Sequence, residues 1–136
     1  EVRLDGTPDT DHFATGLTTD TFNAGETITI TELCYLHADG EWHRADASVQ
    51  GTADGLLGIS LAAGTDGASM KVALPGSFHR DDTQAWTVGG KIYMSTTTGA
   101  MTQTAPSTAG EIVRIVGHAV SADVMHFFPD PTFVEV

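Results

Sequence analysis

The feature that most constrains the fold of this chain is a series of short apolar runs separated by turns rich in glycine, proline and aspartate. Runs of four to eight residues with alternating apolar and polar positions are typical of half-buried strands. No window longer than about ten residues has the spacing of an amphipathic helix, and the best helical candidate is a turn at residues 77–84. The sequence therefore predicts an all-β fold, with strands at residues 26–31, 33–36, 41–45, 55–62, 70–74, 91–95, 100–103, 111–116, 118–120, 124–128 and 132–136.

Two of the predicted turns contain a glycine between strands of hairpin length. Gly40 separates residues 33–36 from residues 41–45, and Gly99 separates residues 91–95 from residues 100–103. Glycine adopts the positive φ that tight hairpin turns require. We therefore predict two β-hairpins, and in the first one Trp42 is expected to pack against an apolar neighbour on the adjoining strand.

The second half of the chain resembles the first half in the order of these features. Tyr93 corresponds to Tyr35 and Gly117 corresponds to Gly58, at nearly the same separation along the chain. A glycine within a strand marks a bulge or a close approach of another backbone. The pattern indicates an internal duplication whose two copies pack into one small barrel or sandwich, because a single copy would leave an apolar face uncovered. In the second copy we expect a core made of Tyr93, Ile115 and Phe127.

Residues 1–24 differ in composition from the rest of the chain. They are rich in Thr, Asp and Gly, and Phe13, Leu17 and Phe22 are their isolated apolar residues. We predict an extended N-terminal arm over residues 1–24 and a single β domain over residues 25–136. The three apolar residues are candidate assembly contacts, since aromatic anchors are common where arms bind a neighbouring protein. The alternative is a frayed terminus.

The charge of the chain limits its partners. Six basic and eighteen acidic residues give a formal net charge of −12. This excess opposes contact with nucleic-acid phosphates and with anionic membranes. No run of eighteen apolar residues is present to span a bilayer. The acidity is compatible with simple solubility, with a saline habitat, or with docking on a basic surface.

The six histidines are the residues that invite a site hypothesis. His37 and His43 flank the first hairpin turn, where Asp39 or Asp46 would complete a set of three metal ligands. A second pair, His118 and His126, is expected on adjacent strands. Neither spacing matches a compact zinc motif, and the chain contains no G-x-S-x-G, H-E-x-x-H, P-loop or dinucleotide fingerprint. We therefore predict no catalytic residue, no metal and no cofactor.

The single cysteine, Cys34, lies between Leu33 and Tyr35 in an apolar run. It has no cysteine partner for an intramolecular disulfide. No neighbour in the sequence would clearly lower its pKa, so the sequence predicts a buried, unreactive thiol.

Four short segments carry a resemblance to a known family: VALPGSF at residues 72–78, WTVGGKIYM at 86–94, GAMT at 99–102 and IVGHA at 115–119. They are similar to segments of the small all-β structural proteins of tailed bacteriophages, especially capsid decoration or cement proteins with a β-tulip-like fold. The resemblance implies a non-enzymatic protein that forms a homotrimer on the outer surface of a phage head, binds the major capsid protein and stabilises the capsid lattice. It also implies that a terminal arm reaches a neighbouring subunit.

Two other functions are compatible with the sequence. Similar V-G-x-A-x-S and F-x-P segments occur in phage fibres and other virion proteins, so a fibre or receptor-binding tip domain is one alternative. A metal-dependent β-barrel enzyme that uses the histidines is the second.

Overall fold

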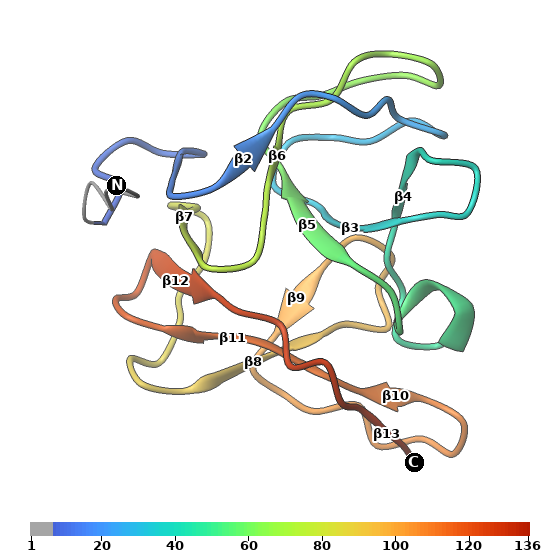
Figure 1. Cartoon of the computed structure of the whole chain (residues 1–136). Helices are drawn as coiled ribbons and strands as arrows, with labels where there is room; N and C mark the ends of the chain where they lie inside the picture. The colour runs from blue at the N-terminus through green and yellow to red at the C-terminus, as the bar shows by residue number, and fades with distance from the viewer. Residues whose placement is uncertain (1–6) are drawn as a thin grey trace.

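The computed structural model describes residues 7–136, which form two antiparallel sheets packed face to face and a small two-stranded sheet near the C-terminus (Figure 1). The described residues contain no α-helix, only the 3₁₀ turn η1 (Gln50–Thr52), and hence no helix able to cross a membrane. The all-β prediction is confirmed. The strands are β1 (Ala14–Thr15), β2 (Thr18–Thr19), β3 (Leu33–Leu36), β4 (Trp42–Arg44), β5 (Leu57–Ser60), β6 (Val72–Ala73), β7 (Ser77–Arg80), β8 (Lys91–Met94), β9 (Met101–Thr102), β10 (Ile112–Val113), β11 (Ile115–Ala119), β12 (Val124–Phe127) and β13 (Val134–Glu135).

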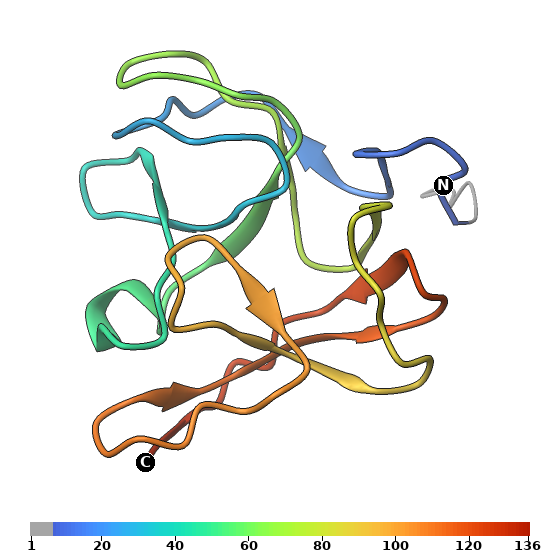
Figure 2. The ribbon, with the colours of Figure 1, turned by 180° about the vertical axis from the view of Figure 1, so that it is seen from behind.

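The two large sheets repeat one strand order. The five-stranded sheet has the order β2-β6-β5-β3-β4, and the six-stranded sheet has the order β1-β7-β12-β11-β8-β9. Apart from β1, each strand of the second sheet has a counterpart at the same position in the first. The β10–β13 pair extends beyond the six-stranded sheet, where the C-terminus lies (Figures 1 and 2). The sandwich is therefore built from two halves of the same topology.

The strand registers also correspond between the two halves. Tyr35 is paired with His43 on one side and with Leu57 on the other. Tyr93, its counterpart in the second half, is paired with Thr102 and with Ile115. This correspondence of order and register is what the internal repeat in the sequence predicts.

The main core lies between the two large sheets. It includes Leu57 and Ile59 from the five-stranded sheet and Ile92 and Phe127 from the six-stranded sheet, all almost completely buried. Phe127 is therefore a core residue as expected. The prediction was wrong for Tyr93 and Ile115, which are only partly buried because they point to the outer side of the six-stranded sheet.

The five-stranded sheet is covered on its outer side as well. Ala24, Ile28 and Met70, from the loops before β3 and before β6, pack there against Cys34 and Trp42. Trp42 is paired with Leu36 across the hairpin and makes an edge-to-face contact with Phe22. This confirms the expected apolar neighbour of Trp42.

The two mid-strand glycines differ in local geometry. The pairing of β3 with β5 is continuous through Gly58, where a side chain would collide with Cγ1 of Val72. At Gly117 the register of β11 against β8 shifts, which is a bulge, and a side chain would collide with the backbone carbonyl of His126. Gly58 thus marks a close approach, and Gly117 marks both a close approach and a bulge.

Three predicted elements are wrong. The strand expected over residues 111–120 breaks at Arg114 and not at Gly117, because β10 pairs with β13 whereas β11 runs through Gly117 and pairs with β8 and β12. Residues 26–31 form no strand: Ile28 makes one isolated bridge to Gly64, and the chain turns at Thr31, which has a φ of 69°. The alternation there reflects burial of Ile28 beneath loops, without a neighbouring strand. The proposed helical turn at residues 77–84 begins instead with strand β7, because this segment pairs with β1 on one side and with β12 on the other.

Residues 14–24 lie against the sheets of their own chain. β1 pairs with β7, β2 pairs with β6, and Ala24 is buried in the cluster around Trp42. Residues 1–6 of the predicted arm lie outside the described part of the chain. The division at residue 24 stays a prediction, and the structure shows that the segment before it contributes an edge strand to each sheet.

Candidate functional site

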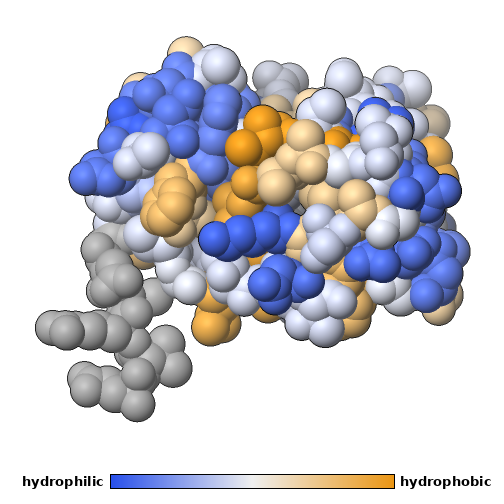
Figure 3. All heavy atoms as spheres, turned by 90° about the horizontal axis from the view of Figure 1, so that it is seen from above, coloured by the Kyte–Doolittle hydropathy of each residue, from blue (hydrophilic) through white to orange (hydrophobic). Residues whose placement is uncertain are grey.

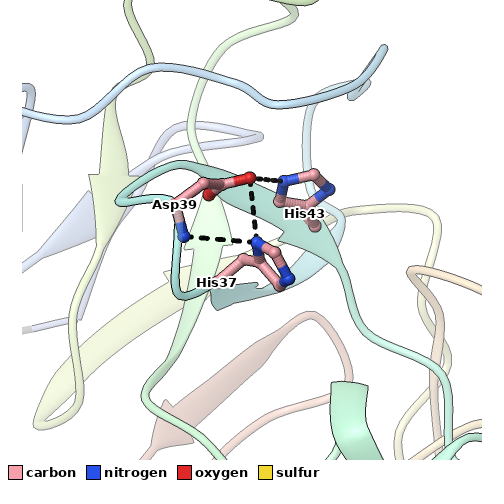
Figure 4. Close-up of side chains that lie close together, drawn as sticks. All are labelled: His37, Asp39 and His43. Carbon is pink, nitrogen blue, oxygen red and sulfur yellow. Dashed lines mark hydrogen bonds and ion pairs between the residues drawn. The ribbon is translucent and has the colours of Figure 1, made fainter.

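The β3–β4 hairpin brings His37, Asp39 and His43 together, as Figure 4 shows. One carboxylate oxygen of Asp39, Oδ2, lies 2.8 Å from Nδ1 of His37 and 3.1 Å from Nε2 of His43. The two imidazole centroids are 4.8 Å apart. The structure therefore confirms that the two histidines meet across the turn with Asp39 between them.

Local structure explains this arrangement. Gly40 has a φ of 87° and closes the turn, while the backbone N–H of Glu41 donates to Oδ1 of Asp39 at 2.9 Å. Asp46, the other carboxylate considered as a third ligand, is directed elsewhere: its side chain accepts hydrogen bonds from Ser48 and from Thr98. Asp46 is thus not part of the cluster.

The second predicted histidine pair lies on the outer side of the six-stranded sheet. His118 and His126 are directly opposite each other on β11 and β12. The His126 ring packs between Phe78, at a centroid distance of 4.9 Å, and Phe128, at 5.8 Å. Because His126 contacts aromatic rings on both sides, it belongs to an aromatic row more than to a ligand set.

We call Phe78, His126 and Phe128 the aromatic row. Phe128 is 61 % exposed, and the row borders a shallow groove of about 300 Å³. No acidic residue occurs in any of the six strands of this sheet. The groove is lined by Ile115, His118, His126, Phe128, Asp130 and Pro131.

A third cluster was not predicted from the sequence. His12 lies 3.4 Å from a carboxylate oxygen of Asp11 and 3.8 Å from one of Asp81. Nearby His79 is 2 % exposed, and burial lowers its pKa to about 4. Within residues 7–136, its Nε2 has no hydrogen-bond partner. No local pattern signals this cluster, because the pairing of β1 with β7 joins segments that are far apart in the sequence.

The predicted assembly residues have different environments. Phe13 is 50 % exposed and Leu17 is 53 % exposed, and Phe13 lines a groove of about 280 Å³ beside β1 and β2. Phe22 packs on Trp42 of its own chain, at a centroid distance of 6.3 Å. Their role as assembly contacts stays a prediction.

Another apolar area lies on the face seen in Figure 3, where hydrophobic atoms gather near the middle and hydrophilic atoms flank them. The loops at that end of the molecule form a shallow groove of about 460 Å³. Its lining residues are Thr27, Ile28, Thr29, Ala63, Gly64, Thr65 and Ala68.

Cys34 is completely buried and has no cysteine partner. Burial raises the pKa of its thiol far above the usual value, and the nearby carboxylates of Glu32 and Glu26 raise it further. The prediction of a buried structural thiol is confirmed.

Comparison with known proteins identifies the family. A family model described as phage cement protein matches residues 15–124, a range that includes strands of both large sheets and ends at the first residue of β12. No curated protein and no solved structure matches the chain. Cement proteins are structural, non-enzymatic proteins of the virion capsid. The chain belongs to the phage cement protein family, whose members bind the phage capsid and stabilise it.

Proposed function

We propose that this protein binds the outside of a phage head as a homotrimer, with the major capsid protein as its partner. Family membership supports a position on the capsid. The trimer, the outer surface and the identity of the partner are proposed from the resemblance to capsid decoration proteins, and the distribution of exposed residues indicates which surfaces would make the contacts.

The observation that carries the proposal is the aromatic row on the uncovered side of the six-stranded sheet. The five-stranded sheet is covered on both sides by apolar clusters, whereas the outer side of the six-stranded sheet has no such cover among the described residues. Aromatic side chains are enriched in the buried centres of protein interfaces, and their rings lose little conformational entropy on binding. Phe128 and Phe78 would therefore be the central contacts with the capsid.

The distribution of charge also supports the outer side of the six-stranded sheet as the docking face. In a chain with a net charge of −12, this side of the sheet presents Lys91 opposite His118, and both are exposed. Arg80 is paired with Asp82 at 2.6 Å and with Asp123 at 3.5 Å, so these three side chains together contribute no positive charge to the face. The strands of this face contribute no carboxylate, and Asp130 is the acidic residue that lines its groove, so repulsion from another acidic surface is smaller here than the net charge of the molecule suggests.

The trimer would use the exposed residues near β1 and β2. Phe13 and Leu17 lie there, and the adjacent groove also contains Leu61 and Lys71. Phe22 would contribute only the surface that Trp42 leaves free. A trimer presents three copies of the docking face, so that modest affinity at each copy becomes strong attachment to a repeated lattice.

The test uses capsids that lack the cement protein. Phe128→Ser should weaken binding of the purified protein at least roughly tenfold, the effect of losing a central aromatic contact. Leu56→Ser is the matched control, because Leu56 is 48 % exposed at the end of the other sheet. A cryo-electron microscopy map of the decorated head should place the aromatic row against the shell.

Three results separate the parts of the proposal. Density only at a tail tip would refute the capsid function in favour of a fibre or receptor-binding domain. Normal capsid binding by Phe128→Ser would refute the docking face alone. Sedimentation of the wild type as a monomer at micromolar concentration would refute the trimer, and dissociation of a trimer by Phe13→Ala with Leu17→Ala would support the contacts proposed for it.

A further inference from the structure

The tip of the β3–β4 hairpin has the geometry of a metal-binding site. We propose that His37, Asp39 and His43 bind one divalent transition-metal ion of the zinc type, through Nδ1, Oδ2 and Nε2. The proposal is independent of the capsid function and of any catalysis. It departs from the expectation of no metal, which rested on the absence of a compact zinc motif in the sequence.

The distances are close to those of a ligand set. The three ligand atoms all lie within 4.8 Å of one another, and Oδ2 is 2.8 Å and 3.1 Å from the two imidazole nitrogens. Ligands at about 2.0–2.1 Å from a tetrahedral ion are roughly 3.3 Å apart. Oδ2 of Asp39 is therefore within a few tenths of an ångström of the required separation from each imidazole nitrogen. Three protein ligands leave at least one coordination position for water.

The surroundings already hold two of the ligands in place. The imidazole of His43 packs on Gly25, where any side chain would collide with the ring. Tyr35 contacts both imidazoles, with centroid distances of 5.9 Å to each. Asp39 is held by the N–H of Glu41 through Oδ1, so Oδ2 faces the two rings. These contacts reduce the conformational entropy that His43 and Asp39 would lose when an ion binds.

The hydrogen-bond directions are also compatible with a bound metal. The Glu41 backbone N–H donates to Oδ1 of Asp39, which leaves Oδ2 facing the two imidazoles. Nδ1 of His37 faces both Oδ2 and the backbone N–H of Asp39, the latter at 3.3 Å, and Nε2 of His43 faces Oδ2. These two nitrogens coordinate an ion when each ring carries its proton on the other nitrogen. The net charge of −12 favours accumulation of cations.

The donor set distinguishes among metals. Two imidazole nitrogens and one carboxylate oxygen favour Zn²⁺, Ni²⁺ and Cu²⁺ over the oxygen-seeking Ca²⁺ and Mg²⁺. The cluster of Asp11, His12 and Asp81 has only one imidazole, and its ligand atoms are farther apart. It is therefore a suitable internal control.

The test is a calorimetric titration in which ZnCl₂ is added to the full chain, which is first treated with a chelator to remove bound metal. The wild type should bind one ion, whereas His43→Gln and Asp39→Asn should each weaken binding at least about tenfold, because each removes one ligand. Asp39→Asn retains the oxygen that accepts the Glu41 N–H, so the turn should be preserved, and circular dichroism checks this. The control variant His12→Gln should bind as the wild type does.

A second measurement needs no variant. In NMR spectra of the wild type, substoichiometric Cu²⁺ should broaden the imidazole signals of His37 and His43 before those of His12 and His118. The proposal is overturned if Zn²⁺ shows no saturable binding at millimolar concentration, if the variants bind as the wild type does, or if Ca²⁺ binds equally well at the hairpin.

Discussion

Replacement of Arg114 by methionine should destabilise the fold by about 2–4 kcal/mol. Arg114 lies between β10 and β11 and is only 5 % exposed. Its Nε donates to the carbonyl of Asp130 at 2.8 Å, and Nη1 donates to the carbonyls of Ala53 and Gly55 at 2.7 and 2.9 Å. One guanidinium thus joins the η1 loop of the first half to the C-terminal segment of the second.

The magnitude follows from two opposing contributions. Each hydrogen bond from a charged group stabilises by roughly 1.5–3 kcal/mol, and the three carbonyls lose their donor in the variant. Removal of the guanidinium also recovers a desolvation cost of several kcal/mol, the same effect that lowers the pKa of Arg114. Methionine fills much of the space, so no large cavity adds to the loss.

The assay is urea denaturation of the wild type, Arg114→Met and Arg114→Lys, followed by circular dichroism. Lysine keeps the charge but cannot match the directions of three bonds, so its stability should lie between those of the other two proteins. A loss below about 0.5 kcal/mol for Arg114→Met would show that desolvation cancels the hydrogen bonds, and would refute the role of Arg114 as a link between the halves.

Three further predictions concern the glycines, a buried histidine and the aromatic contacts. Gly117→Ala should destabilise the fold by about 1–3 kcal/mol and Gly117→Ser by more, because the added atoms meet a backbone carbonyl. Gly40→Ala and Gly40→Ser should each cost about 1–2 kcal/mol, since only the positive φ of Gly40 disfavours a side chain there. Urea denaturation compares the four variants, and equal losses for Ala and Ser at Gly117 would contradict the steric explanation. Burial lowers the pKa of His79 to about 4, so its contribution to the free energy of unfolding is fully present above the unfolded pKa of 6.5 and should fall by roughly 3 kcal/mol as the pH drops toward 4. In His79→Gln the free energy of unfolding should depend less on pH over this range, and an unchanged slope would contradict the prediction. Phe22→Ala should lower the free energy of unfolding by about 1–2 kcal/mol through loss of the Trp42 contact. Phe13→Ala should change the free energy of unfolding of the monomer by less than about 0.5 kcal/mol, and a loss as large as that of Phe22→Ala would show that Phe13 also packs within its own chain.

The hairpins and the histidine cluster were predictable because their information is local. Gly40 and Gly99 are required by the positive φ of their turns, and both have it. Once the first turn is placed, His37 and His43 must flank it on the same face. Short sequence separation therefore sufficed to bring Asp39 between them.

The wrongly predicted elements show what local sequence patterns cannot predict, which is the pairing between distant segments. The alternation over residues 26–31 reports that Ile28 is buried, and it contains no information on whether a neighbouring strand is present. Residues 77–84 show the converse case: β7 is a strand because β1 and β12 lie on either side of it. The aromatic row depends on the same pairing, since β7 and β12 bring Phe78 beside His126.

The sequence by itself determined the all-β class, the two hairpins, the repeat and the family resemblance, because turn chemistry and strand periodicity act over a few residues. Only the tertiary structure decided which side of each sheet is covered. Tyr93 and Ile115 look like core residues in the sequence, yet they lie on the outer side of the six-stranded sheet. Alternation reveals that a strand has two faces, but the choice of the buried face depends on which distant segments pack there.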